Sequence, residues 1–380
     1  MGVQPFTHDL EPWNISEGAF PKEGSMYDKL KFFLKYAILA PSTHNTQPWT
    51  FKILNDNTIE LYADRSRTLP VADPRGRELT ISCGVALGYL QITIRHFGYR
   101  HKIEVLPSSG ERKSDEHLLA RINVYDGNGN NDDTTNIQEC NIEVNSLQEE
   151  DNNRLFGAIT KRRTNRFRFE DRNIPDILLV GFYYIVDKYP RRQQQVKPIW
   201  LHIAQENDEK NALAELIVQG DHIQLSDKAF RHELVSWIHD NRSRRRRDGI
   251  PGYALGISNL MSMISPFVIK KFNINRKHAE KDWECAVTSP VLAVLGSHSD
   301  EPLDWINTGM ALANILLLAG SENVCCSFLN QPIQIPQLRP KLLDAIGNKK
   351  GFPQVLLRMG YYNQQIRPTP RRSVEEVLLR

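Results

Sequence analysis

Hydrophobic and polar residues along this chain follow two spacings, one typical of helices and one typical of strands. Apolar positions recur at helical spacing in residues 26–40, which predicts an amphipathic helix. Residues 50–62 alternate apolar and polar side chains around a polar turn, which predicts a β-hairpin. Residues 79–97 are apolar on nearly all sides and predict a buried helix, and residues 103–106 and 120–125 are expected to be strands.

A polar segment, residues 126–153, interrupts this pattern and predicts a boundary between two domains. Two pairs of similar segments occur in the same order on either side of it. Residues 84–90 resemble residues 309–315, and each segment is expected to open a buried helix. Residues 47–53 resemble residues 197–203 more faintly, again before an alternating strand. Because fixed order is typical of repeats, the sequence favours a diverged internal duplication.

The composition excludes only a few classes of protein. The chain has 380 residues, is 40% hydrophobic and carries a net charge of +3, so no general attraction to nucleic acid or to anionic lipid is expected. Its five cysteines show no disulfide framework and no zinc-ligand spacing, so no metal is assigned. No apolar run is long enough to cross a bilayer. We expect a cytoplasmic protein.

The segment 40–49 has the composition of a ligand-binding loop. Between the predicted helix and strand it presents Ser42, Thr43 and Asn45 as hydrogen-bonding groups on a backbone stiffened by proline. A planar ligand with polar edges would suit such a loop. His44 is expected to be a turn residue.

The second half begins with a basic stretch that has no counterpart ahead of the first predicted helix. Arg162 and Arg166 are expected one helical turn apart with Thr164 nearby, so that they could converge on a phosphate. A solvated basic helix face is the alternative. If the halves pack as a pseudo-dimer, this stretch would face the 40–49 loop across their interface and form one composite site.

Several motifs then resemble the FMN-dependent nitroreductase superfamily. They are Arg-Arg-Thr-x-Arg at 162–166, Ala-Pro-Ser-x-x-Asn-x-Gln-Pro-Trp at 40–49, and Pro-x-x-Leu-Leu-Arg-x-Gly-Tyr at 353–361 followed by Thr-Pro-Arg-Arg at 369–372. The order of blocks along the whole chain is similar to the tandem, Acg-like branch of that superfamily; the blocks are residues 41–51, 69–84, 163–166, 248–251, 329–332 and 369–372.

The resemblance implies an α+β, nitroreductase-like fold in which two tandem halves form an intramolecular pseudo-dimer, each a mixed sheet wrapped by helices. The implied organisation is an N-terminal extension (1–25), a first half (26–125), a polar linker (126–153) and a second half (154–380). An insertion at about 238–275 would lie over the site as a lid. Further oligomerisation stays open.

The resemblance also implies one FMN at the interface of the halves. Arg162, Thr164 and Arg166 would hold its phosphate with help from Arg371 or Arg372, and the 40–49 loop would line the isoalloxazine. Residues 327–330 would lie along the pyrimidine edge, where simple nitroreductases usually have an acidic residue and a glycine that this chain lacks. The implied cofactor-binding residues are Pro41, Ser42, Thr43, Asn45, Gln47, Arg162, Arg163, Thr164, Arg166, Ser327, Leu329, Asn330, Arg371 and Arg372.

Three functions follow as hypotheses. The first is a nitroreductase-like oxidoreductase that passes electrons from NAD(P)H through FMN to a small electron-poor acceptor of the nitroaromatic or quinone type. No catalytic acid or base is required, and none is assigned. The second is FMN storage or sequestration beneath the lid with little turnover. The third is a polyanion-binding protein that uses the arginine run 242–247.

Overall fold

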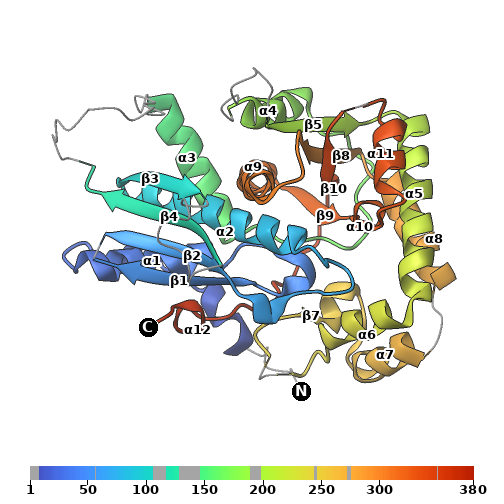
Figure 1. Cartoon of the computed structure of the whole chain (residues 1–380), viewed down its shortest axis with the longest axis horizontal. Coiled ribbons are helices and arrows are strands. Elements are labelled where there is room, and N and C mark those ends of the chain that lie inside the picture. Colours follow the sequence, from blue (N-terminus) through green and yellow to red (C-terminus); the bar gives the residue numbers. More distant parts are fainter. Residues whose placement is uncertain are drawn as a thin grey trace.

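The first part of the computed structural model is an antiparallel sheet packed against helices (Figure 1). The structure describes residues 8–55, 57–105, 117–127, 146–188, 198–243, 246–271, 275–348 and 350–380. The sheet has the strand order β1-β2-β4-β3. Its elements are α1 (Met26–Ala37), β1 (Trp49–Leu54), β2 (Thr58–Ala63), α2 (Arg77–His96), β3 (Arg100–Val105) and β4 (Leu118–Tyr125). The predicted helices, hairpin and strands of this region are confirmed.

A second four-stranded antiparallel sheet has the order β5-β8-β10-β9. The elements around it are α3 (Ser146–Ile159), α4 (Asp176–Asp187), β5 (Ile199–Ala204), β8 (Val291–Ser297), α9 (Pro302–Ser321), β9 (Val324–Phe328), α10 (Gln331–Gln334), α11 (Arg339–Ala345) and β10 (Phe352–Tyr361). Most of the predicted linker, residues 128–145, lies outside the described residues, as does the beginning of the N-terminal extension, residues 1–7.

The two sheets have the same connectivity. Along the chain the first runs β1-β2-α2-β3-β4 and the second β5-β8-α9-β9-β10. Replacing each element of the first series by its counterpart turns the order β1-β2-β4-β3 into β5-β8-β10-β9. The halves differ most between their first two strands. In the first half a short turn joins β1 and β2. In the second half this position holds α5 (Asn207–Ser226), α6 (Lys228–Ser236), β6 (Ile238–His239), β7 (Ile250–Pro251), α7 (Asn259–Lys271) and α8 (Asn275–Val287).

Helices α2 and α9 cross at the centre of the molecule and join the two sheets (Figure 1). A Cβ at Gly84 would lie 2.4 Å from the carbonyl oxygen of Ile306, and a Cβ at Gly309 would lie 2.2 Å from that of Ile81. Each glycine therefore allows the other helix to approach, and the two contacts mirror each other. The expectation that these glycines open their helices is wrong, because both lie inside 20-residue helices at equal distances from the first residue.

The loop between α1 and β1 is held at both ends by buried side chains. Helix α1 starts with a capping box between Ser25 and Asp28. Leu39 after the helix and Trp49 at the start of β1 are both 0% exposed. The intervening residues are therefore anchored to the core on both sides.

The C-terminal segment crosses from the second sheet back to the first (Figure 1). The amide nitrogen of Leu379 donates to the carbonyl oxygen of Phe51 over 2.7 Å, after a short helix α12 (Val374–Val377). Trp13, at the end of the 3-10 helix η1 (His8–Trp13), donates through Nε1 to the carbonyl oxygen of Thr369 over 2.8 Å. Segments near both ends of the chain therefore lie close to the loop between α1 and β1.

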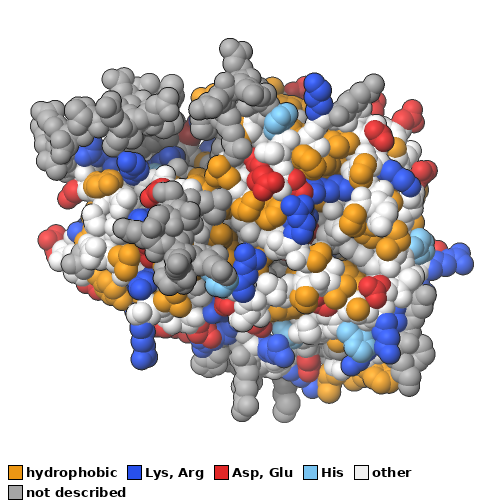
Figure 2. Space-filling view, in the orientation of Figure 1, with side chains coloured by type: hydrophobic (Ala, Val, Ile, Leu, Met, Phe, Trp, Pro, Cys, Tyr) orange, Lys and Arg blue, Asp and Glu red, His pale blue; other side chains and the backbone are white. Residues whose placement is uncertain are grey.

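The surface carries charged side chains of both signs, as the small net charge of the chain predicts. Figure 2 shows basic and acidic side chains interspersed over the described part of one face. Among the described residues, one helix, α9, is long and apolar enough to cross a membrane, but 72% of its most apolar window is buried inside the fold. Its length and hydrophobicity are therefore those of a core helix.

Candidate functional site

The loop after α1 has a strained backbone. His44, Asn45 and Gln47 adopt positive φ angles of 50°, 56° and 50°. Non-glycine residues in this region each cost of order 1–3 kcal/mol, and such strain is concentrated at functional sites. His44 lies in the short 3-10 helix η3 (Thr43–Asn45), in agreement with its expected place in a turn. Burial, followed by the charge of Arg166, lowers the pKa of His44 to about 4, so the imidazole is neutral at pH 7.

Asn45 holds this loop against two distant segments. Its Nδ2 donates to the carbonyl oxygens of Gly249 (2.8 Å) and Pro370 (3.1 Å), and its Oδ1 accepts from Arg371 Nη1 (2.8 Å). Gln47 acts similarly, because Nε2 donates to the carbonyl oxygen of Arg247 and Oε1 accepts from the amide of Arg372, both over 2.8 Å. These bonds offset the strain of the loop and connect it to the insertion and to the C-terminal segment.

The basic stretch lies at the edge of the second sheet. Helix α3 ends at Ile159, and Thr164 forms a parallel bridge with Cys326 in β9. Arg358 in β10 holds the stretch by donating through Nη2 to the carbonyl oxygens of Asn165 and Phe167, both over 3.0 Å. The expectation that Arg162 and Arg166 lie one helical turn apart was therefore wrong; extended backbone beside β9 brings them together.

The strained loop and the basic stretch line one pocket. The space between its lining atoms is about 430 Å³, and part of it is open to solvent. Of the predicted residues, those in its lining are Pro41, Ser42, Asn45, Arg162, Arg163, Thr164, Arg166 and Arg371. Four lining residues were not among the predicted site residues; they are Trp13, Ala254, Arg367 and Thr369.

The pocket is strongly electropositive. None of the described residues that line it is acidic, although five of them are arginines. Burial is the first cause that lowers the pKa of Arg163 and of Arg166 to about 10 and that of Arg371 to about 9, and neighbouring arginines add to each shift. Arg162 Nε, Arg166 Nη1 and Arg371 Nε are buried without a hydrogen-bond partner. Buried donors and uncompensated charge suit an anionic ligand.

Trp13 forms a wall of the pocket between two of these cations. The guanidinium carbons of Arg163 and Arg371 lie 4.1 and 4.9 Å from its ring centroid. Cation–π contacts of this kind are worth about 0.5–2 kcal/mol each and fix the planes of the guanidinium groups. No periodic pattern marks residues 1–25, so sequence reasoning had no signal for this contribution.

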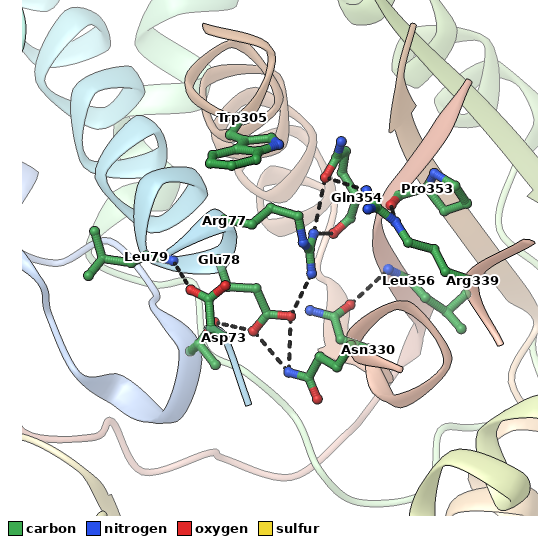
Figure 3. Close-up of polar contacts among 12 residues, drawn as sticks. Asp73, Arg77, Glu78, Leu79, Trp305, Asn330, Arg339, Pro353, Gln354 and Leu356 are labelled. Atoms are coloured by element: carbon green, nitrogen blue, oxygen red, sulfur yellow. Dashed lines mark hydrogen bonds and ion pairs between the residues drawn. The ribbon is translucent and has the colours of Figure 1, made fainter. Parts of the chain in front are cut away.

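Six predicted residues lie outside the pocket. Thr43 donates to Glu78 Oε2 over 3.0 Å, and Arg372 donates to the carbonyl oxygen of Gln47 over 3.1 Å. Asn330 accepts at Oδ1 from the amide of Leu356 over 2.9 Å and so holds β10 (Figure 3). The other three are Gln47, Ser327 and Leu329. Ser327 and Leu329 are buried next to the basic stretch, since Cys326 pairs with Thr164.

A buried polar network beside the loop joins the two halves (Figure 3). Arg77 Nη1 donates to the carbonyl oxygen of Gln354 over 2.6 Å, and Gln334 Nε2 donates to Glu78 Oε2 over 2.9 Å. Asp73 accepts at Oδ2 from the amide of Leu79 at the start of α2. Burial, followed by the charge of Glu78, raises the pKa of Asp73 to about 6.

The insertion closes the pocket from one side. Ala254, in the 3-10 helix η6 (Gly252–Leu255), is part of the lining. The neighbouring Tyr253 donates its hydroxyl to the carbonyl oxygen of Pro368 over 2.7 Å and packs under the guanidinium of Arg367 at 4.3 Å. Part of the insertion therefore lies beside the pocket and is bonded to the segment that contains Pro368.

Fold and pocket together define an α+β protein with a partly enclosed site suited to an anionic ligand. No protein-family model matches the chain. Among curated proteins, Rv3131 and Acg of Mycobacterium tuberculosis H37Rv, provisionally named NAD(P)H nitroreductases, are each 24% identical over 356 residues. The alignment covers 92% of this chain in both cases, 91% of Rv3131 and 95% of Acg. PigM of Serratia sp. ATCC 39006, also provisionally named a nitroreductase, is 21% identical over 361 residues, which are 91% of each chain.

These similarities confirm the resemblance to the nitroreductase superfamily and to its Acg-like branch. Among solved structures, an FMN- and NADPH-dependent nitroreductase, NfnB, from Sphigopyxis sp. strain HMH is 16% identical with a TM-score of 0.40, covering 59% of this chain and 96% of its own. A nitroreductase with bound FMN from Bacteroides fragilis NCTC 9343 is 14% identical with a TM-score of 0.32, covering 56% and 94%.

Proposed function

We propose that this chain binds FMN and acts as a nitroreductase-like NAD(P)H oxidoreductase. The observation that carries the proposal is the set of buried guanidinium donors without partners in the pocket. Arg162, Arg166 and Arg371 would hold the phosphate, because a phosphate dianion supplies both the missing acceptors and the missing negative charge. The provisional names of the relatives support the same activity.

The 40–49 loop fits the role of the opposite wall. Ser42 accepts the amide of Gln47 at Oγ over 2.8 Å, and Asn45 is fully occupied in holding Gly249, Pro370 and Arg371. The loop would therefore meet the isoalloxazine with Pro41, Ser42 and backbone groups, and Asn45 would fix its shape. Bound FMN would supply the redox chemistry, taking a hydride from NAD(P)H and reducing a nitroaromatic or quinone acceptor.

The protein's own task in this chemistry is positioning and electrostatics. Arginines around the phosphate would fix the cofactor's position, and the strained loop is already in place because bonds from two distant segments hold it. His44 is neutral and therefore adds no further positive charge beside Arg166. Reductant and acceptor would use the same open side in turn, which predicts ping-pong kinetics.

FMN storage or sequestration is the second candidate, and the closed insertion favours it. Gly249 is bonded to Asn45 through both its amide and its carbonyl oxygen, and Tyr253 is bonded to Pro368. A lid held by these bonds would slow cofactor exchange and limit access to acceptors. Turnover distinguishes the two candidates, since both require FMN.

The polyanion hypothesis has less support from the arginine run. Arg247 forms an ion pair with Glu376 at 3.1 Å, and its carbonyl oxygen accepts from Gln47. Arg244 and Arg245 lie outside the described residues. Arg247 is therefore engaged with the C-terminal segment and with the 40–49 loop, although its side chain is partly exposed.

Identical strand order and the mirrored contacts of Gly84 and Gly309 support an internal duplication with a pseudo-twofold relation between the halves. We accordingly propose tandem nitroreductase-like halves at 26–125 and 154–380. The insertion is longer than the sequence predicted. When the strands of the two halves are matched by their order, the inserted segment comprises everything between β5 and β8, including α5 to α8, and thus exceeds the expected 238–275.

An absorbance spectrum of the purified protein tests the proposal. We expect a flavin spectrum that bleaches on anaerobic addition of NADPH or NADH and recovers when a quinone is added. Arg166→Ala should lower FMN occupancy, whereas the matched variant Arg246→Ala, at an exposed arginine of the insertion, should not. Tightly bound flavin without bleaching would favour storage, and equal flavin retention in both variants would contradict the assigned phosphate site.

A further inference from the structure

A second cluster of polar side chains lies between α5 and α8, away from the arginine pocket. It contains Asp221 of α5 and His278 and Asp282 of α8, and one ligand atom from each lies within 4.8 Å of the others. His278 Nε2 is 3.6 Å from Asp282 Oδ2 and 3.9 Å from Asp221 Oδ1. Ligands around a tetrahedral zinc ion with bonds of 2.0–2.2 Å are about 3.3–3.6 Å apart. The observed spacing is therefore close to that of a coordination shell.

Helix periodicity and one glycine build this arrangement. His278 and Asp282 are one turn apart and share a face of α8, which packs against α5. A Cβ at Gly220 would lie 2.6 Å from Cβ of Gln331, so the glycine lets α10 approach α5. As a result, Gln331 Nε2 lies 3.0 Å from Asp221 Oδ1 and 2.9 Å from Asp282 Oδ2.

Among the described residues, the two carboxylates of the cluster have His278 as their basic ion-pair partner. The Asp221 side chain is only 3% exposed, and in that part of the chain no lysine or arginine forms an ion pair with either carboxylate. Asp221 Oδ2 and Gln331 Oε1 are also buried without a hydrogen-bond partner. Two neighbouring carboxylates and two unsatisfied buried oxygens together call for positive charge at this position.

We propose that Asp221, His278 and Asp282 bind a divalent transition-metal ion of the zinc class. One imidazole nitrogen with carboxylate oxygens suits Zn²⁺, whereas Ca²⁺ and Mg²⁺ prefer six or more oxygen ligands, some of them water. The fourth ligand is a water molecule or Gln331 Oε1, which a rotation of the side-chain amide would turn toward the ion. His278 is 45% exposed on its side chain, so the ion can enter from solvent.

The position of the cluster indicates a structural role. Helix α8 follows α7 at the end of the insertion, and α10 directly follows the buried strand β9. An ion bound here fastens α8 to α5, because its three protein ligands come from these two helices, and it also holds α10 where Gln331 is the fourth ligand. The sequence analysis found no zinc-ligand spacing because Asp221 and the pair on α8 come together only in the folded chain.

Metal binding by the full-length protein tests this proposal without reference to flavin. Protein freed of metal by a chelator is titrated with ZnCl₂ by calorimetry, and Co²⁺ is used in parallel for its visible absorption. We expect one equivalent of Zn²⁺, a rise in apparent Tm with zinc, and a tetrahedral Co²⁺ spectrum. His278→Ala and Asp282→Asn should each weaken zinc binding at least tenfold and abolish the Co²⁺ spectrum.

The matched control is His232→Ala, at an exposed histidine of α6 outside the cluster, which should bind zinc as the wild type does. Circular dichroism of the metal-free variants establishes that they are folded. Asp221→Asn, which keeps the shape of the side chain, is the second test if His278→Ala does not fold. The proposal is overturned if the wild type binds no zinc, or if these cluster variants and the His232 variant bind it equally.

Discussion

Replacing Arg166 by methionine should separate two effects of this arginine. One is the loss of stability that its buried charge causes in the flavin-free protein, and the other is its contribution to FMN binding. Arg166 lines the pocket, and its Nη1 is buried without a partner. Burial, followed by the charges of Arg358 and Arg162, lowers its pKa from 12.5 to about 10. One pKa unit corresponds to about 1.36 kcal/mol, so the charged group lowers the free energy of unfolding by roughly 3 kcal/mol without an anion. The penalty is fully present below the folded pKa and disappears as the pH rises through 10 toward 12.5.

Methionine has a similar length and no charge, so Arg166→Met removes this penalty at pH 7. Part of the gain is offset because Arg166 retains some contact with solvent, and we expect the flavin-free variant to be about 1–3 kcal/mol more stable than the wild type. FMN should reverse this ranking. Ligand at 100 times its Kd stabilises a protein by about 2.7 kcal/mol, and the variant should receive much less at the same concentration.

Thermal unfolding of flavin-free protein at pH 7, with and without graded FMN, measures both effects. Without FMN the apparent Tm of Arg166→Met should be higher than that of the wild type, by about 1–2 °C for each kcal/mol in a chain of 380 residues. Arg246→Met, at an exposed position of the insertion, serves as the control and should behave as the wild type in both series. A flavin-free Arg166→Met protein that is less stable than the wild type, or that gains as much from FMN, would refute the reasoning.

Three further predictions concern the helix crossing, the N-terminal wall and the buried network. Gly84→Ala places a Cβ 2.4 Å from a backbone oxygen and should lower the free energy of unfolding, measured in urea, by about 3 kcal/mol or more. The control is Gly157→Ala in α3, whose Cβ meets nothing within 4 Å and which should raise that free energy by about 0.5–1 kcal/mol. Similar values for both variants would contradict the close helix crossing. Trp13→Leu removes two cation–π contacts and should weaken FMN binding roughly tenfold in a fluorescence titration, and unchanged affinity would exclude Trp13 from the site. Because the pKa of Asp73 is raised from 3.8 to about 6, its folded form holds the proton more tightly, so stability should fall as the pH rises through this interval. Asp73→Asn should reduce that slope in urea unfolding at pH 4 to 7, and an unchanged slope would argue against the shift.

Local patterns in the sequence predicted local structure well. Apolar spacing located α1 and α2 to within a few residues, because each helix buries one face or all faces against a core. The error at Arg162 and Arg166 has a physical cause. Their backbone follows β9, and the bridge between Thr164 and Cys326 cannot be read from neighbours in the chain.

The candidate site was only partly accessible to sequence reasoning for the same reason. The polar side chains of the 40–49 loop and the arginines of the basic stretch predicted two walls of the pocket. The role of each side chain within the loop could not be predicted from the sequence. Asn45 uses its whole amide on Gly249, Pro370 and Arg371, and these partners come from segments more than two hundred residues away. Trp13 gave no signal at all, because its importance lies in two guanidinium groups that only the fold brings to it.

The insertion between β5 and β8 explains how two similar halves can carry one asymmetric site. A short turn is sufficient between the equivalent strands β1 and β2, so the second sheet does not need α5 to α8 for its own strand pairing. The inserted segment instead supplies Ala254 to the pocket lining and Gly249 as a hydrogen-bond partner of Asn45. Asp221, His278 and Asp282 lie in the same insertion, on the helices that begin and end it. A metal ion there would hold the two ends of the insertion together and so fix the base from which its lid reaches the pocket.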